Sequence, residues 1–334
     1  MRQPEFWKAE ASGRDAAFVL RALLAPVSWA YAFAAARRIA MASPHHVPIP
    51  VVCVGNFTVG GAGKTPIARA IRARLGPGAH ILSRGYGGKI EGPLRVTPDM
   101  DAREVGDEPL LHAADGPAWI ARDRVAGARA AASAGAHVLI LDDGFQNPSL
   151  AKDLSIVAVD AGFGVGNGAV FPAGPLRERL ADGLERASAI VFLHSAGDAE
   201  TEARPAWLGD CTKPILHAHL EPTAKLPDGP LIAFAGIARP EKFFDSLEAQ
   251  GANLEDAFSF ADHHVFSEED LAELTQVAAD RKAQLITTEK DYVRLSADWR
   301  ARVTMLPVTA RFADEAALDA VLAPIASRVS AAHG

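Results

Sequence analysis

A glycine-rich loop between an apolar run and a helical pattern constrains this chain more than any other feature. Apolar residues 51–54 lead into the loop 58–65, and a helical pattern begins near Pro66. In such a loop the glycines turn backbone N–H groups toward an anion, and the helix N-terminus adds partial positive charge. Lys64 can then reach a β- or γ-phosphate and the Thr65 hydroxyl can ligate Mg²⁺. The sequence therefore predicts a site for a nucleoside triphosphate.

The whole loop is expected to contact the phosphates: Thr58, Val59, Gly60, Gly61, Ala62, Gly63, Lys64 and Thr65. It departs from the usual G-x-x-x-x-G-K-[ST] pattern because Thr58 stands at the place of the first glycine. The alternative is a flexible glycine loop with an incidental lysine. The strand-loop-helix context on both sides favours the phosphate site.

Composition places the chain among globular proteins and limits its partners. With 334 residues and 49% hydrophobic content, it can bury a sizeable core and is expected to hold more than one domain. Its net charge is −7 and it has no long basic run, so nucleic acid is not an expected partner. Its two cysteines, Cys53 and Cys211, are too few for a disulfide framework and suit a reducing compartment.

An apolar stretch near the N-terminus indicates contact with a membrane. Residues 22–36 carry no charge, include Trp29 and Tyr31, and lie between Arg21 and Arg37. A helix of that length covers roughly 22 Å, whereas the hydrocarbon core is about 30 Å thick. The pattern therefore favours a monotopic helix inserted shallowly from the cytoplasmic side. The alternative is a core helix of a soluble protein.

Short apolar runs that alternate with Ala/Arg-rich stretches predict a mostly parallel, doubly wound α/β sheet. Strands are expected at 51–54, 80–83, 137–141, 155–159 and 189–193, and helices at 66–75, 122–134 and 176–187. A half-exposed strand at 215–220 and a polar connection at 221–230 follow. The next pattern predicts strands at 231–235, 284–287 and 303–308, helices at 241–250 and 268–281, and a last Ala-rich helix.

These patterns divide the chain into three parts. Residues 1–48 form the membrane-associated helix and its Pro-containing linker. Residues 49–226 form the P-loop nucleotide-binding domain, and residues 227–334 form a smaller C-terminal α/β domain.

Acidic pairs follow two of these segments. Asp142 and Asp143 end the apolar run 137–141, at the edge where α/β sheets bind ligands, so one of them can hold Mg²⁺. An Asp-Gly turn is the alternative. Asp107 and Glu108 lie before another apolar run; Asp107 is a candidate to accept the proton of an acceptor alcohol, and either residue can instead be a helix N-cap. The sequence leaves both readings of Asp107 open.

Two further groups are ambiguous. Arg177 and Glu178 are expected at the start of a helix, where the arginine can neutralise phosphate charge and the glutamate can help to hold the metal; a solvated Arg-Glu pair is the alternative. Asp262 precedes His263 and His264, and a histidine beside an aspartate can act in proton transfer. Ordinary surface histidines are the alternative.

Taken together, eight blocks of the sequence resemble the tetraacyldisaccharide 4′-kinase family of lipid A biosynthesis. They occur in order at 58–66, 83–87, 106–109, 142–146, 166–168, 172–178, 262–263 and 288–291. The resemblance implies an ATP- and Mg²⁺-dependent kinase that phosphorylates the 4′-hydroxyl of a tetraacylated glucosamine disaccharide 1-phosphate. The product is lipid IVA, a precursor of lipopolysaccharide. It further implies a location at the cytoplasmic face of the inner membrane, and we expect a monomer.

The resemblance also implies roles for individual residues. Asp107 activates the 4′-hydroxyl and pairs with His263, the histidine next to Asp262, while Lys64 and Arg177 face the transferred phosphate. Thr65, Asp142, Asp143 and Glu178 lie around Mg²⁺. The remaining active-site candidates have less defined roles: Tyr86, Glu108, Arg124, Gln146 and Asn147.

Asn147 departs from the family pattern, in which a histidine usually follows the glutamine. Asparagine forms hydrogen bonds but takes up no proton near neutral pH. Two other functions compete with the kinase. A membrane-peripheral P-loop ATPase or GTPase could act as a switch on a protein partner, although residues 288–291 lack the guanine-reading order [NT]-K-x-D. A non-catalytic scaffold with a relic loop leaves Asp107, Asp142 and Asp143 unexplained.

Overall fold

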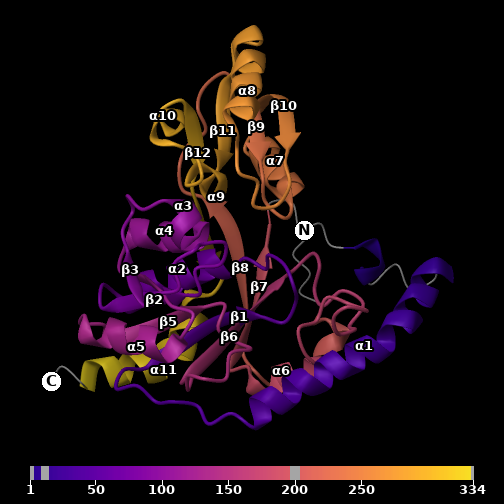
Figure 1. Ribbon diagram of the computed structural model, residues 1–334, viewed down its shortest axis with the longest axis vertical. Helices are drawn as coiled ribbons and strands as arrows, with labels where there is room; N and C mark the ends of the chain where they lie inside the picture. Colours follow the sequence, from indigo (N-terminus) through magenta and orange to yellow (C-terminus); the bar gives the residue numbers. More distant parts are fainter. Residues whose placement is uncertain (1–3, 9–14, 196–203, 332–334) are drawn as a thin grey trace.

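Two sheets organise the chain. The computed structural model describes residues 4–8, 15–195 and 204–331 (Figure 1). The described strands form a nine-stranded sheet in the order β13-β8-β7-β6-β1-β5-β2-β4-β3 and a four-stranded sheet in the order β10-β9-β11-β12. The larger sheet contains β1 (Val51–Asn56), β2 (Ala79–Ser83), β3 (Leu94–Val96), β4 (Ala118–Ile120), β5 (Val138–Asp142), β6 (Leu154–Asp160), β7 (Ala189–His194), β8 (Ile215–Pro222) and β13 (Val308–Phe312).

The larger sheet confirms the predicted doubly wound fold. Strands β8, β7, β6, β1, β5, β2 and β4 run parallel, and only the outer pairs β13–β8 and β3–β4 are antiparallel. The central strands are buried on both faces, which is why they read as continuous apolar runs. Because β1 and β5 are parallel neighbours, the loops at 57–63 and 143–147 leave the same edge of the sheet.

Helices cover both faces of this sheet. On one face, α2 (Lys64–Leu75) and α11 (Glu315–Ala331) bury Ile67, Ile71, Leu318 and Leu322 in one core cluster. On the other face, α5 (Arg124–Ser133) and α6 (Leu180–Arg186) pack on a second cluster. Two shorter helices, α3 (Ala102–Val105) and α4 (Asp107–Asp115), lie by strand β4, next to the edge strand β3.

The smaller sheet is entirely parallel. It contains β9 (Pro230–Ala235), β10 (Asn253–Ser259), β11 (Gln284–Thr288) and β12 (Val303–Leu306). Helix α7 (Pro240–Ala249) packs on one face of it and α8 (Glu268–Asp280) on the other. The short helices α9 (Glu289–Tyr292) and α10 (Ala297–Arg300) complete this unit. Strand β10 was not predicted, since none of its residues is buried and its half-buried positions include the charged Asp256, so the sequence shows no clear apolar alternation.

The predicted C-terminal domain, 227–334, requires a correction at its end. The predicted strand 303–308 is divided: β12 belongs to the smaller sheet, whereas β13 pairs antiparallel with β8 of the larger one. Pro307 stands between the two strands and has no N–H for a ladder. Helix α11 then packs on the larger sheet. The smaller unit therefore ends near residue 306, and the chain then returns to the larger unit.

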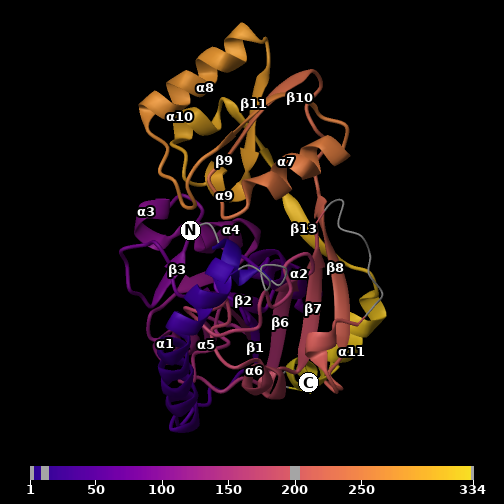
Figure 2. The same cartoon turned by 90° about the vertical axis from the view of Figure 1, so that its right-hand side faces the viewer.

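The predicted apolar helix is present as α1 (Asp15–Ala40), a long rod along the outside of the larger unit (Figures 1 and 2). Residues 17–40 are long and apolar enough to cross a membrane by length and composition, and only 11% of the apolar window is buried. Leu23, Trp29 and Phe33 are each about 70% exposed. Residues 1–3 and 9–14 of the predicted segment 1–48 lie outside the described residues.

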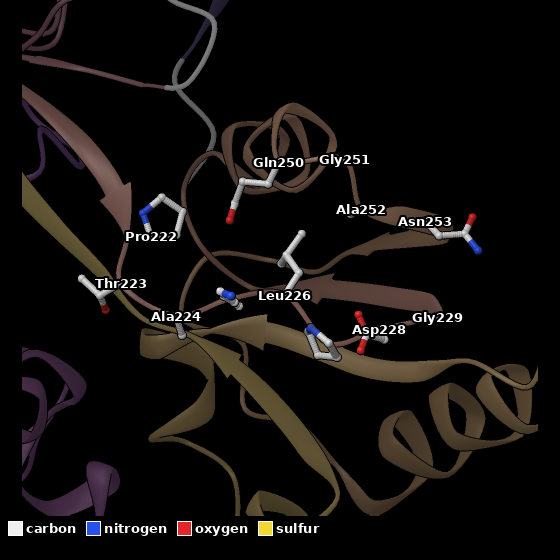
Figure 3. Close-up of a pocket in the computed structure, with 12 residues that line it drawn as sticks. Pro222, Thr223, Ala224, Leu226, Asp228, Gly229, Gln250, Gly251, Ala252 and Asn253 are labelled. Atoms are coloured by element: carbon white, nitrogen blue, oxygen red, sulfur yellow. The ribbon is translucent and has the colours of Figure 1, made fainter.

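One cavity of about 640 Å³ lies where the two units are connected. Its walls are formed by residues 222–229, which link β8 to β9, and by residues 250–253 after α7 (Figure 3). None of the predicted site residues lines this cavity. The chemistry is therefore expected at the sheet edge beside the glycine loop.

Candidate active site

The glycine loop leaves β1 and enters α2 at Lys64, as predicted. Gly63 has the left-handed backbone angle φ = 70°, and a Cβ atom there would lie 1.9 Å from Leu193 Cδ2. Only glycine fits this position, because both the backbone and the packing against β7 exclude a side chain. The loop thereby turns its backbone toward the N-terminus of α2, the geometry of a phosphate cradle.

Thr58 is accommodated at the place of the first glycine by a short bridge. It pairs with Leu176, and the neighbouring Val59 N–H donates to the Pro175 carbonyl at 2.8 Å. The Thr58 carbonyl accepts hydrogen bonds from the Asn56 amide at 2.7 Å and from Arg177 Nε at 3.0 Å. An extended bridge suits a β-branched residue, so glycine is not required here.

Lys64 and Thr65 both face the acidic end of β5. Lys64 Nζ lies 3.7 Å from Asp143 Oδ2, and the Thr65 hydroxyl donates to Asp142 Oδ2 at 3.2 Å. The same Asp142 oxygen lies 2.8 Å from His112 Nε2, and both of these side chains are almost fully buried. The last residue of β5, Asp142, and the next residue, Asp143, therefore place one carboxylate at Thr65 and one at Lys64.

Arg177 holds Asp143. Its guanidinium lies 2.7 Å from Asp143 Oδ1 and 3.4 Å from Oδ2, in a two-pronged contact. Burial raises the pKa of the Asp143 carboxyl, but the positive charges of Lys64 and Arg177 outweigh burial and hold this pKa below its usual value. Asp143 is therefore a carboxylate that orients the two cations predicted to face the transferred phosphate.

Glu178 is buried, but both of its oxygens are already engaged. They accept hydrogen bonds from Arg186 at 2.7 and 2.9 Å, and one also accepts from Gln146 Nε2 at 3.0 Å. The same Gln146 nitrogen donates to the Asn56 carbonyl. The expected helix start at Arg177 and Glu178 is wrong, since α6 begins at Leu180; the two residues lie in the preceding loop, which is tied to the glycine loop instead.

A second group gathers around Asp107. Asp107 is the first residue of α4, behind Gly106 at φ = 92°, and it is 5% exposed. Its Oδ2 lies 3.3 Å from His263 Nδ1 and forms an ion pair with Arg294. Neither Asp107 nor Glu108 is the N-cap of α4, so that alternative is excluded.

The environment keeps Asp107 ionised. Burial alone raises the pKa of its carboxyl, but the hydrogen bond from His263 and two nearby cations outweigh burial and hold the pKa well below its usual range. The two cations are Lys290 and Arg294. The hydrogen bond to Asp107 in turn raises the pKa of His263, against the opposing effect of burial.

The structure distinguishes the two adjacent histidines. His263 has φ = 59° and points to Asp107, and its ring lies 5.7 Å from that of Tyr86. His264 turns the other way, with Nε2 2.9 Å from Asp270. His263 is thus the histidine that lies at the site. Glu108 is 2.6 Å from Lys290 Nζ.

Asn147 and Arg124 have structural contacts. The Asn147 side-chain oxygen accepts from the backbone N–H and the hydroxyl of Ser149, at 2.9 and 2.7 Å, which closes a turn after the acidic pair. Arg124 is buried at the start of α5 and donates to the carbonyls of Ser83 and Ala121. In these contacts both residues shape the loops around the site.

The sequence did not predict three residues that lie at the site. His112 lies within an apolar helix, so nothing in its neighbours marked it as a partner of Asp142. Lys290 and Arg294 belong to the smaller unit and follow strand β11, yet they contact Glu108 and Asp107. The family resemblance includes the block 288–291, but the local sequence gives no indication of which residues of the larger unit this block contacts.

The Asp142 environment fits a divalent cation. Asp142 Oδ1 is buried and, within the described part of the chain, has no hydrogen-bond partner. No cluster of three or more His, Cys, Asp or Glu side chains suited to a metal occurs among residues 4–8, 15–195 and 204–331. Mg²⁺ at P-loops takes few protein ligands and completes its shell with phosphate oxygens and water, so one hydroxyl and one carboxylate suffice.

A P-loop at the edge of a doubly wound sheet, with cations and carboxylates converging on it, defines a P-loop phosphotransferase. Comparison with known proteins identifies the family of phosphotransferases to which the chain belongs. Residues 20–326 match the family model described as tetraacyldisaccharide-1-P 4′-kinase, and the chain belongs to this family. The chain is thus a kinase of lipid A biosynthesis.

Individual relatives agree along nearly the whole chain. Tetraacyldisaccharide 4′-kinase of Maricaulis maris is 52% identical over 331 residues, 96% of each chain, and that of Hyphomonas neptunium is 50% identical over 334 residues, 98% of this chain and 99% of its own. A crystal structure of the apo form of LpxK from Aquifex aeolicus in complex with ATP has a TM-score of 0.74 at 28% identity. That match covers 92% of this chain and 99% of the other.

Proposed function

We propose that this chain transfers the γ-phosphate of ATP to the 4′-hydroxyl of a tetraacylated glucosamine disaccharide 1-phosphate, giving lipid IVA. The observation that carries this proposal is the placement of Lys64 and Arg177 on one carboxylate, Asp143, which follows β5, together with a separate buried carboxylate, Asp107. A kinase needs both parts: cations for the transferred phosphate and a group that receives the proton of the acceptor.

The proposed mechanism divides the work between two groups of residues. The glycine loop and Lys64 bind the phosphates, and Arg177, steadied by Asp143, neutralises charge on the transferred group. Asp107 accepts a hydrogen bond from the 4′-hydroxyl and takes its proton as the new P–O bond forms and the bond from the γ-phosphorus to the β–γ bridging oxygen breaks, which releases ADP. His263 orients Asp107 and stabilises its charge. Helix α4 connects the two groups, since it begins at Asp107 and carries His112, the partner of Asp142.

Thr65 and Asp142 would hold Mg²⁺. When bound, Mg²⁺ neutralises negative charge on the phosphate oxygens. This proposal is supported by the unpartnered Asp142 Oδ1 and the Thr65 hydroxyl beside Oδ2. Of the predicted ligands, Asp143 and Glu178 pair with Arg177 and Arg186, so we assign them the positioning of these cations and of Gln146 instead.

Asp142→Asn is expected to raise the Mg²⁺ concentration needed for half-maximal activity by about 10-fold or more, because a neutral amide binds this cation less well than a carboxylate. Titration of Mg²⁺ at saturating ATP measures this effect. Asp319→Asn, a change at an exposed ion pair with Arg74, is the matched control. An identical Mg²⁺ dependence for Asp142→Asn and the wild type would exclude Asp142 as a ligand.

We further propose that α1 anchors the enzyme to the cytoplasmic face of the inner membrane, where an acceptor with four acyl chains resides. The exposed apolar side chains of α1 support this, as do Arg37 and Arg38 in its last turn. The helix is also joined to the site: Arg38 donates to the Gln146 carbonyl at 3.1 Å. The proposed assembly is a monomer, since a single chain supplies every side chain of the site.

Replacing Leu23 and Phe33 with glutamate in the full chain is expected to weaken binding to anionic lipid vesicles by at least about 10²-fold. Each exposed apolar side chain that enters the lipid contributes about 1.5–3 kcal/mol. Cosedimentation with vesicles measures the change, and Gln276→Glu on exposed α8 controls for added charge. Unchanged sedimentation of the double variant would refute the anchor.

The competing switch predicts a different product from the same assay. A partner-dependent ATPase or GTPase would release labelled phosphate into water, whereas the kinase leaves the label on lipid. Incubation with γ-labelled ATP and a tetraacyl disaccharide 1-phosphate separates the two. Labelled lipid supports the kinase, and nucleotide loss without labelled lipid supports the switch.

A further inference from the structure

The segment 288–294 of the smaller unit reaches across to the larger one at three points. Glu289 accepts two hydrogen bonds from Arg69 of α2, at 2.9 and 3.1 Å. Lys290 pairs with Glu108 at 2.6 Å, and Arg294 pairs with Asp107. Figure 2 shows α9 directly over α4, and the two helices are in contact. The segment thus contacts both the helix that follows the glycine loop and the helix that begins with Asp107.

Hydrogen bonds within the smaller unit hold the side chain of Arg294 in place. Its Nη1 donates to Asp291 Oδ1 at 2.8 Å and to the Gly236 carbonyl at 3.0 Å. Asp291 is fully buried and is itself held by the Gly236 N–H and the Thr288 hydroxyl. The Arg294 side chain is 8% exposed, and these contacts hold its guanidinium in one orientation, in which Nη2 faces Asp107. Exposed ion pairs at protein surfaces are usually held loosely, whereas Arg294 is held by several hydrogen bonds from its own unit.

Arg294 shares its target with His263. Both contact the same oxygen, Asp107 Oδ2, while Oδ1 accepts the Glu108 N–H at 2.9 Å. His263 Nδ1 also lies 3.3 Å from Arg294 Nη2, which can only donate. The raised pKa of His263 favours a proton on Nδ1, and that proton is then donated to the Asp107 carboxylate. With both oxygens held, the Asp107 carboxylate cannot rotate, and its orientation toward an acceptor depends on Arg294 as much as on His263.

We propose that Arg294 is a positioning residue for the phosphoryl transfer, which fixes the Asp107 carboxylate and keeps it ionised when the smaller unit is docked on the larger one. This inference rests on the proposed role of Asp107 as the proton acceptor. In a loose transition state the acceptor proton leaves late, so orientation of the alcohol matters more than a strongly basic carboxylate. A firmly held anion of low basicity is suited to that task.

The charged groups that face Asp107 determine its response to pH. They are His263, Lys290, Asp291 and Arg294 from the smaller unit and Glu108 from its own helix. Without Arg294 one cation is lost and burial opposes ionisation more effectively, so the pKa of Asp107 rises. Protonated Asp107 accepts no proton. Activity is therefore lost as the pH falls through that pKa, and a raised pKa moves the loss to higher pH.

The test compares Arg294→Gln, Arg294→Lys and wild type in lipid phosphorylation across pH 5–9. For Arg294→Gln we expect kcat at pH 8 to fall about 10–10²-fold, with the KM for ATP unchanged. We also expect the acidic limb of kcat/KM for the lipid, which the low pKa of Asp107 places below this range in the wild type, to move up to the acidic end of the range, so that the activity of Arg294→Gln falls toward pH 5. Arg294→Lys restores the charge and should recover the acidic limb in part.

Arg300→Gln is the matched control. Arg300 lies nearby in the same unit but donates only to the carbonyls of Tyr292 and Val293 in the described structure. Its pH profile should overlay that of the wild type. If Arg294→Gln and the wild type have the same pH dependence, the positioning role is refuted, even if the maximal rate of the variant is lower. Full activity of Asp107→Asn would refute the proposed role of Asp107 as proton acceptor. This outcome is measured on a different variant, so it is distinguishable from a failure of the Arg294 proposal.

Discussion

Lys64→Ala is expected to reduce the transfer of phosphate to lipid by about 10²–10³-fold, the usual effect of removing one preorganised donor from a developing negative charge. Lys64 is 9% exposed, and among its described contacts its ammonium lies near only Asn56 and Asp143. Lys64 is the only lysine of α2, and the arginines of this helix pair with acidic side chains elsewhere, so none of them is placed to replace it. Initial rates at saturating ATP and lipid measure the loss.

The control for this variant is Lys89→Ala, which removes a lysine from the exposed surface. It should retain wild-type rates. Near-wild-type activity of Lys64→Ala would show that the loop 58–65 does not bind the transferred phosphate. Thermal unfolding of both variants separates a loss of chemistry from a loss of fold, since Lys64 is buried beside Asp143.

Asp107→Asn should lower kcat by about 10²–10⁴-fold, the range for removal of a general base. Asparagine keeps the size of the side chain and one acceptor oxygen, but it takes up no proton from an alcohol. Because Asp107 begins α4 and has no described contact with the glycine loop, the affinity for ATP should stay the same. Single-turnover kinetics and a nucleotide-binding titration measure the two quantities separately.

Asp101→Asn serves as the control for Asp107. It changes an aspartate to asparagine at the exposed N-cap of the neighbouring helix α3, where both residues cap equally well. A pure ATP-binding defect in Asp107→Asn, with kcat intact, would contradict the assignment of Asp107 as the proton acceptor.

The sequence predicted the parts of the site that lie on one local element. The strand before the glycine loop, the loop itself and the helix after it follow from apolar runs and glycine chemistry within some 25 residues. Asp142 and Asp143 were found for the same reason, because the end of a buried parallel strand is visible as an apolar run followed by carboxylates.

The contacts between units could not be predicted in this way. Arg294 lies 187 residues from Asp107, and nothing local to either residue reveals the partner. The predicted helix start at Arg177 was wrong because the segment pairs with Thr58 through Leu176, a tertiary contact that overrides its helical pattern. Pro307 is visible in the sequence, yet the return of β13 to the larger sheet depends on pairing with β8.

Asn147 illustrates how a departure from a family pattern can be absorbed. The sequence posed the question whether a missing histidine removes a proton-transfer group. In the structure the Asn147 side chain closes a turn with Ser149, while the neighbouring Gln146 reaches the site. A residue whose side chain stabilises a turn shapes the loop that carries Gln146, and asparagine performs that task well.

The most direct test of the central claim is the fate of the γ-phosphate. Full-length protein in mixed micelles is given γ-labelled ATP, Mg²⁺ and a tetraacyl disaccharide 1-phosphate, and the position of the new phosphate is determined by phosphorus NMR. We predict one labelled phosphate at the 4′-oxygen, in a yield that Lys64→Ala reduces to near background. Nucleotide consumption with all label in free phosphate, or label at another hydroxyl, would contradict the account.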